Sequence, residues 1–184
     1  MSVLVVNAGS SSLKYRVIDI ETEASVHSGD FEELGETSGS MSMATAIEHA
    51  LESLPEGMSI TAVGHRVVHG GESFVEPTLI REDVVAQLEG LSFLAPLHNP
   101  SNLAGIRTAL RALPDVPHVA VFDTAFHHTL SPAASTLALS EELRRDRGIR
   151  KYGFHGTSHR YVSSVAAELL GGDPETHRVI TLHL

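Results

Sequence analysis

The distribution of apolar and polar residues along the chain predicts several strands first, and then helices and strands in alternation. Short apolar segments bounded by Gly, Ser, Pro or Asp are typical of strands. Strands are predicted over Ser2–Val6, Leu13–Ile20, Ala24–Phe31, Ile60–Val63 and Pro117–Phe122, and from His177 toward Leu184.

Apolar residues at helical spacing predict a helix over Met41–Leu54, with Ser40 as its N-cap, after a polar loop over Glu32–Ser40. A second polar segment with glycines predicts a loop over Gly64–Gly71. Asn99 is the predicted N-cap of a helix whose first residue is a proline, which favours that position. Further helices are predicted over Arg81–Leu91, Pro100–Leu113, Pro132–Arg145 and His159–Leu170. This order indicates an α/β layer structure with a mixed sheet flanked by helices.

Composition narrows the class of protein. The 184 residues suit one domain, or one domain and part of another, and 42% hydrophobic with 20% charged residues is typical of a globular chain. The absence of cysteine excludes disulfides, thiolate metal sites and cysteine nucleophiles, and favours a cytoplasmic location. We expect no signal peptide, and no apolar run reaches membrane-spanning length.

A formal charge of −10 disfavours nucleic acid and anionic lipid as partners. The exception is an arginine cluster, which we interpret as a solvated helix end and which comprises Arg144, Arg145, Arg147 and Arg150. Twelve histidines are many for this length, and several lie in glycine-rich segments, which favours a functional site.

The turn between the first two strands, Asn7–Lys14, contains one glycine and three consecutive serines. Such a turn offers backbone and hydroxyl donors to an anion, and Lys14 adds a positive charge. An ordinary hairpin turn explains the composition equally well, and the sequence contains no P-loop motif.

The segment His65–Gly71 places Arg66 between histidines and ends in two glycines. The planar guanidinium can bind a carboxylate or phosphate, although a structural ion pair is an equal alternative. A zinc site at His65 and His69 requires a third ligand and is a lesser interpretation.

Two later segments also contain polar residues in positions typical of sites. Asp123 ends a predicted strand, where α/β proteins place ligands, or it caps a helix. His155 lies in a glycine loop and could donate a hydrogen bond to a charged transition state, whereas a metal pair with His159 is the lesser reading.

Taken together and in this order, these segments resemble the acetate kinase family. The strings that carry the resemblance are Val5–Lys14 (VVNAGSSSLK), Gly64–Gly71 (GHRVVHGG), Pro96–Pro100 (PLHNP), Phe122–His127 (FDTAFH) and Tyr152–His159 (YGFHGTSH). They extend over the whole chain, and the first and last are highly specific.

The resemblance implies the ribonuclease-H-like, actin-like ATPase fold of sugar kinases, actin and heat-shock chaperones. We expect residues 1–125 to form most of the first domain and 126–184 to begin an incomplete second domain. Family enzymes are considerably longer and carry a second arginine, the adenosine pocket and a metal-linked glutamate in later segments. We therefore expect this chain to be inactive alone, as a truncated product, a proteolytic product or the product of a split gene.

The resemblance also implies the reaction, which interconverts ATP and acetate with ADP and acetyl phosphate and uses Mg²⁺ or Mn²⁺. The residues implied as catalytic are Arg66, Asp123 and His155. The residues implied to bind acetate are Arg66, Val68, Leu97 and Phe154. The residues implied to contact phosphate or nucleotide are Ser10, Ser12, Lys14 and His183, and Asn7 is implied at the metal. The full-length parent is expected to be a homodimer.

Three alternatives remain open at this stage. A propionate kinase of the same family differs in pocket volume, and valine at position 68 favours acetate. A non-catalytic actin-like binding module would not require Arg66, Asp123 and His155 together. A zinc hydrolase would use His65, His69, His155 and His159.

Overall fold

The computed structural model describes residues 1–35 and 40–183. These residues form two compact units. The first comprises Met1–His69 and Pro77–Val121, and the second comprises Gly70–Glu76 and Phe122–Leu184. The predicted division into domains at residues 125 and 126 stays a prediction.

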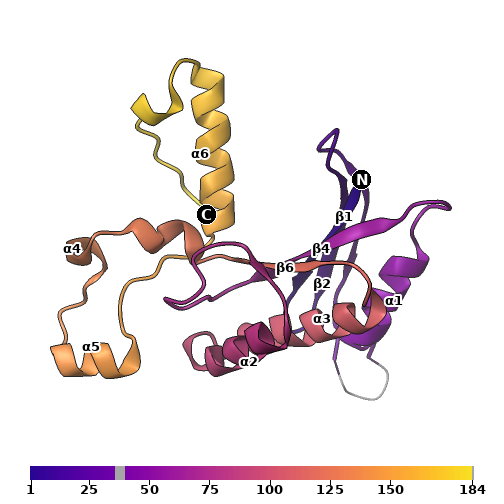
Figure 1. Cartoon of the computed structure of the whole chain (residues 1–184), viewed down its shortest axis with the longest axis horizontal. Helices are drawn as coiled ribbons and strands as arrows, with labels where there is room; N and C mark the ends of the chain where they lie inside the picture. Colours follow the sequence, from indigo (N-terminus) through magenta and orange to yellow (C-terminus); the bar gives the residue numbers. More distant parts are fainter. Residues whose placement is uncertain (36–39, 184) are drawn as a thin grey trace. The chain divides into compact units, whose positions relative to one another are not determined.

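The strands belong to one mixed sheet, drawn in Figure 1, with the order β3-β2-β1-β4-β6-β5. Their bounds are β1 (Ser2–Ala8), β2 (Leu13–Asp19), β3 (Ser25–Phe31), β4 (Ile60–Val67), β5 (Thr78–Leu79) and β6 (His118–Phe122). β1, β2 and β3 form an antiparallel meander, β4 is parallel to β1, and β5 is antiparallel to β6.

The α-helices are α1 (Met43–Glu52), α2 (Glu82–Gly90), α3 (Asn99–Ala112), α4 (Pro132–Ser135), α5 (Glu141–Arg147) and α6 (Gly156–Leu170). Short 3₁₀ helices lie at Ser92–Leu94 (η1), Ala125–Thr129 (η2) and Pro174–Thr176 (η3). In the part of the chain that the structure describes, no helix is both long and apolar enough to span a bilayer.

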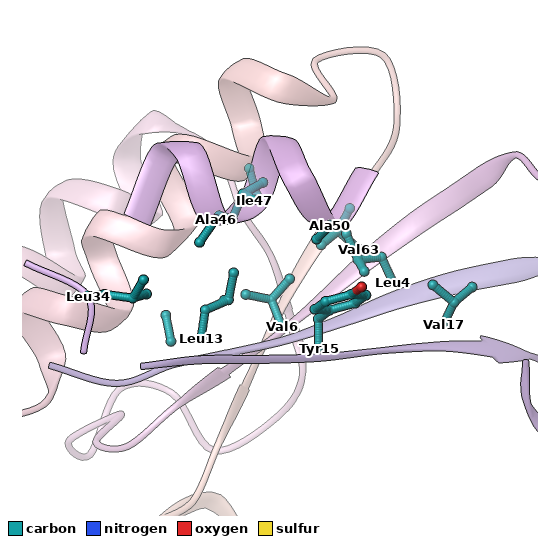
Figure 2. Close-up of a cluster of buried hydrophobic side chains, with 12 residues drawn as sticks. Leu4, Val6, Leu13, Tyr15, Val17, Leu34, Ala46, Ile47, Ala50 and Val63 are labelled. Atoms are coloured by element: carbon teal, nitrogen blue, oxygen red, sulfur yellow. The ribbon is translucent and has the colours of Figure 1, made fainter. Parts of the chain in front are cut away.

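The core of the first unit lies between the sheet and α1, with Ala109 of α3 also buried in it. Alternation along the strands sends Leu4 and Val6 of β1, and Leu13 and Tyr15 of β2, to the same face. Figure 2 shows these side chains meeting Ala46, Ile47 and Ala50 of α1. The opposite face of β1 and β2 therefore remains available for polar side chains.

Several predicted boundaries are wrong for local reasons. The N-cap of α1 is Ser42 and not Ser40, because the Ser42 side chain accepts a hydrogen bond from the backbone N–H of Thr45. The predicted helix over Pro132–Arg145 is interrupted, because Ser140 caps a separate helix, α5, through the N–H of Leu143. The predicted loop over Glu32–Ser40 lies partly outside the described residues.

The strand predicted from His177 does not form within its described residues, which end at His183. A strand requires a neighbouring strand for its backbone hydrogen bonds, and in the described part of the second unit the backbone forms helices and turns after Phe122. The segment is instead held to α6 by a 2.7 Å hydrogen bond between Nδ1 of His159 and Oγ1 of Thr181.

Candidate active site

A row of polar side chains crosses β2, β1 and β4 in the first unit. Asn7 of β1 lies directly opposite Lys14 of β2, and Val6 pairs with His65, so Arg66 follows beside Asn7. The Arg66 Nη1 donates a 3.1 Å hydrogen bond to the Asn7 Oδ1. Since buried residues alternate with these positions, the row occupies the face of the sheet opposite the helix-packed core. Two cations thus flank one amide.

The serine turn adjoins this row. The N–H of Gly9 donates a 2.7 Å hydrogen bond to the carbonyl of Ser12 and closes the turn. A Cβ at Gly9 would come within 2.8 Å of the Ser12 Oγ, so a larger residue there would make the Ser12 hydroxyl rotate away. Ser10 is exposed and Ser12 is half-buried. The turn thus places hydroxyl groups of both serines near the surface beside Asn7.

Lys14 forms an exposed ion pair, with 3.7 Å between its Nζ and the Asp30 carboxylate. An exposed pair of this kind contributes about 0–1 kcal/mol, because water screens both charges. The Lys14 ammonium can therefore exchange Asp30 for an incoming anion at little cost.

Arg66 lies on β4 and not in the predicted loop, because β4 continues to Val67. The hydrophobic alternation continues through Val63, His65 and Val67, which are all buried on one face. The middle position of this pattern is a histidine, which is a polar residue type. The sequence pattern therefore predicted that the strand ends at Val63. A rigid strand, rather than a flexible loop, therefore carries the arginine.

Asn99 does not act as the predicted N-cap. His98 occupies the cap position, and Asn99 is the first residue of α3 with a fully buried side chain. Its Oδ1 accepts from the N–H of His69 at 3.1 Å, and its Nδ2 donates to the carbonyl of His69 at 3.0 Å. The buried backbone N–H and C=O groups of His69 need hydrogen-bond partners. Asn99 supplies both and so fixes the backbone directly after Val68.

Asn102 is a positioning residue that was not among the predicted site residues. Its Nδ2 donates to the carbonyl of Ala8 at 2.6 Å, and its Oδ1 accepts from the N–H of Val68 at 3.0 Å. One side chain thus links the end of β1, where the serine turn begins, to the residue after β4. The available signal was a second polar residue three positions after Asn99, on the same helix face.

His65 belongs to a buried pair and not to a metal site. The Nε2 of His65 lies 2.9 Å from the Nδ1 of His118, whose Nε2 lies 2.9 Å from the carbonyl of Leu113. A carbonyl only accepts, so the Nε2 of His118 carries its proton and the Nε2–H of His65 donates to Nδ1. Burial, with a smaller contribution from His118, lowers the pKa of His65 to about 3. Burial also lowers the pKa of His69.

In the second unit, Asp123 follows β6 and is buried. Its backbone carbonyl accepts a 2.8 Å hydrogen bond from the N–H of Gly156, the first residue of α6. A Cβ at Gly156 would come within 2.4 Å of that carbonyl, so only glycine permits the contact. The helix therefore starts three residues before the predicted His159 and is joined to the Asp123 segment.

His155 directly precedes α6 in a left-handed conformation, with φ of 54° and ψ of 29°. A non-glycine residue in this region costs about 1–2 kcal/mol and commonly marks a functional position. The exposed His155 ring stacks on that of His183, with 4.1 Å between centroids. The Nδ1 of His183 lies 3.3 Å from the Oγ of Ser158. The second unit thus brings His155 and His183 together near the Asp123 segment.

The arginine cluster is only partly a solvated helix end. Arg150 lies beyond α5, and its Nη1 donates a 3.0 Å hydrogen bond to Glu72. Its guanidinium lies 5.5 Å from the centre of the Tyr152 ring. Burial, together with the Glu72 charge, raises the pKa of Tyr152. This pairing joins residues 78 positions apart and was not predicted from the sequence.

The three residues implied for an acetate methyl pocket are accessible to differing degrees. Val68 is half-buried, whereas Leu97 is 76% exposed and Phe154 is 44% exposed. Val68 and Leu97 belong to the first unit and Phe154 to the second. Their assignment to one acetate pocket therefore stays a prediction.

Within the described residues, no group of three or more His, Cys, Asp or Glu side chains could hold a metal ion. The zinc hydrolase is therefore not supported. Of the four histidines in that hypothesis, His65 and His69 are buried, and His65 is hydrogen-bonded to His118.

Comparisons with known proteins now identify the family. The sequence model of the Acetokinase family matches residues 2–184. The chain belongs to the acetokinase family. The acetate kinase of Clavibacter michiganensis subsp. michiganensis is 50% identical over 205 residues, covering 99% of this chain and 52% of that protein. The acetate kinase of Thermotoga maritima is 44% identical over 208 residues, covering 100% of this chain and 52% of that protein.

Solved acetokinase-family structures have the same fold as this chain. Porphyromonas gingivalis acetate kinase gives a TM-score of 0.85 at 38% identity, over 94% of this chain and 50% of that one. A propionate kinase from Francisella tularensis gives 0.86 at 38% identity, over 92% and 49%. The predicted actin-like α/β fold is confirmed. The chain spans about half the length of the curated relatives that it matches.

Proposed function

We propose that this chain supplies the first half of an acetate kinase, which transfers a phosphoryl group between ATP and acetate. The observation that carries the proposal is the row Lys14–Asn7–Arg66, in which two cations and one amide share a face beside the serine turn. Membership of the acetokinase family supports the choice of acetate and ATP as substrates.

The chemistry explains why cations are needed more than a base. A carboxylic acid with a pKa near 4.3 is ionised at neutral pH, so acetate requires no deprotonation before it attacks. The obstacle is that a carboxylate must approach a polyanionic phosphate. We assign Arg66 to the carboxylate or the transferring phosphoryl group, and Lys14 with Ser10 and Ser12 to the phosphate oxygens.

The second unit supplies the remaining groups in this proposal. His155 donates a hydrogen bond to the transferring phosphoryl group as its negative charge increases, with His183 stacked against it. Asp123 orients the reacting groups and does not act as a base. We assign Val68, Leu97 and Phe154 to the acetate methyl, as the resemblance to the family implies.

A divalent cation, Mg²⁺ or Mn²⁺, fits the donors present only in part. Asn7 offers one amide oxygen, and Mg²⁺ commonly takes one or two protein ligands and completes its shell with phosphates and water. We therefore propose a cation that arrives with the nucleotide, with Asn7 as its protein ligand. When bound, the cation neutralises phosphate charge. We further propose a cytoplasmic enzyme whose full-length form is a homodimer.

The proposal is tested by joining residues 1–183 to the second half of the Clavibacter michiganensis acetate kinase. Acetyl phosphate formed from ATP and acetate is trapped as the hydroxamate. The joined enzyme is expected to be active, and residues 1–184 alone are expected to be inactive. A joined protein that folds and binds ATP yet forms no acetyl phosphate would exclude the proposed function.

A further inference from the structure

A cavity of about 640 Å³ lies in the first unit beside the serine turn. Gly9 and Ser10 of the turn line it, together with the first residues of α1 and one face of α3. Its volume falls in the range of about 300–1,000 Å³ that is typical of small-molecule sites. The row Lys14–Asn7–Arg66 lies on the opposite face of the sheet, so the cavity is separate from it.

The α3 wall of the cavity is polar and cationic. Ser101, Thr108 and Arg111 line it with Arg107, at spacings that place them along one helix face. Arg107 forms an ion pair with Glu89, and Glu89 does not line the cavity. The Arg111 Nη2 donates to the Thr108 Oγ1 at 3.1 Å, which uses one of its five N–H groups.

The remaining walls are largely apolar, with Leu34, Met43 and Ala44 on one side and Ala104 on another. Among the described residues that line the cavity, none is acidic. A space with an apolar body and two guanidinium groups is complementary to an anion that carries an apolar group.

We propose that this cavity binds a small organic anion, in which a phosphate or carboxylate meets Arg107 and Arg111 and an apolar group lies over Leu34 and Ala104. Ser10 lines the cavity and also belongs to the serine turn. A ligand bound in the cavity therefore changes the surroundings of Ser10 in that turn. Binding is independent of the proposed kinase activity, whereas any effect on turnover rests on it.

Phenyl phosphate is the probe, titrated into the whole chain while backbone amide signals are followed by NMR. We expect saturable shifts at Gly9, Ala44 and Ala104, with a dissociation constant of about 1 mM for so small a ligand. Inorganic phosphate and benzyl alcohol, which each lack one half of the probe, should bind at least about tenfold more weakly.

Variants locate the site. Arg107→Gln with Arg111→Gln should weaken phenyl phosphate binding more than about tenfold, because two charge-assisted hydrogen bonds are lost. Ala104→Phe should block the cavity without changing charge. The matched control Arg145→Gln removes an exposed arginine elsewhere and should leave binding unchanged, as should Lys14→Gln on the opposite face.

Several outcomes would overturn the proposal. Binding that survives in the double arginine variant places the probe elsewhere. Binding lost in Lys14→Gln and kept in Ala104→Phe assigns it to the polar row. Absence of saturation in the unmodified chain excludes the site directly. The arginine side chains are exposed, so their variants retain the fold, and unchanged amide dispersion verifies this.

Discussion

The buried histidine pair of the first unit should make its stability depend on pH. The pKa of His65 is lowered from 6.5 to about 3, chiefly by burial, so the folded state holds this ring neutral. The unfolded state takes up a proton as the pH falls below about 6.5. The stabilisation by neutral His65 is therefore fully present above pH 6.5 and is lost progressively as the pH falls toward 3.

The magnitude follows from these two pKa values. When the pH falls from about 7.5 to 5.5, proton uptake by the unfolded state lowers the free energy of unfolding by about 1.4 kcal/mol. This is roughly a tenfold change in the folding equilibrium. Since His65 is hydrogen-bonded and stacked on His118, with 5.2 Å between ring centroids, protonation would also disrupt that contact.

The assay is hydrogen exchange in urea, read on peptides that cover β1 and β4, because these report the first unit. His65→Gln retains a side-chain N–H donor toward His118 but cannot take up the proton. Its loss of stability between the two pH values should be smaller than that of the unmodified chain by about 1.4 kcal/mol. His49→Gln, an exposed histidine of α1, is the matched control. Equal pH dependence in the unmodified chain and His65→Gln would refute the reasoning.

Three further predictions concern the site. In the joined enzyme, His155→Ala should lower turnover about 10²–10³-fold, and His155→Gly should lower it equally while folding more stably, since glycine adopts the left-handed conformation without strain. A near-normal rate in either variant would remove His155 from the mechanism. Val68→Ala should raise the catalytic efficiency for propionate relative to acetate by about tenfold or more, and an unchanged ratio of the two efficiencies would exclude Val68 from the acyl pocket. Gly156→Ala should destabilise the second unit by about 1–3 kcal/mol, through the clash with the Asp123 carbonyl. The control Gly90→Ala has open space and should be neutral or slightly stabilising in thermal denaturation.

Local sequence patterns predicted most strands and helices of the first unit. Leu4 and Val6 alternate with polar or less buried positions, and the apolar residues of α1 repeat at helical spacing. The pattern failed at β4, where His65 looks polar in sequence. Its burial depends on His118, which lies 53 positions later. A pattern over neighbouring residues does not include so distant a partner, so it could not predict the burial of His65.

The candidate site shows the same limit. The segment Asn7–Lys14 is contiguous, so its residues alone suggested an anion site, and that assignment stays a prediction. Asn102 was not, because its role arises only when α3 lies beside the ends of β1 and β4. The pairing of Arg150 with Glu72 likewise spans 78 positions. Long-range hydrogen bonds decide these roles, and they follow from the packed fold.

The central claim is that Arg66 binds the negatively charged carboxylate or the transferring phosphoryl group when acetate is phosphorylated. The most direct test is the rate of acetyl phosphate formation by the joined enzyme with Arg66→Ala, compared with Arg145→Ala as a charge-matched control. We predict a loss of turnover of about 10²–10³-fold for Arg66→Ala and a normal rate for the control. A rate for Arg66→Ala within about twofold of the unmodified enzyme would contradict the account.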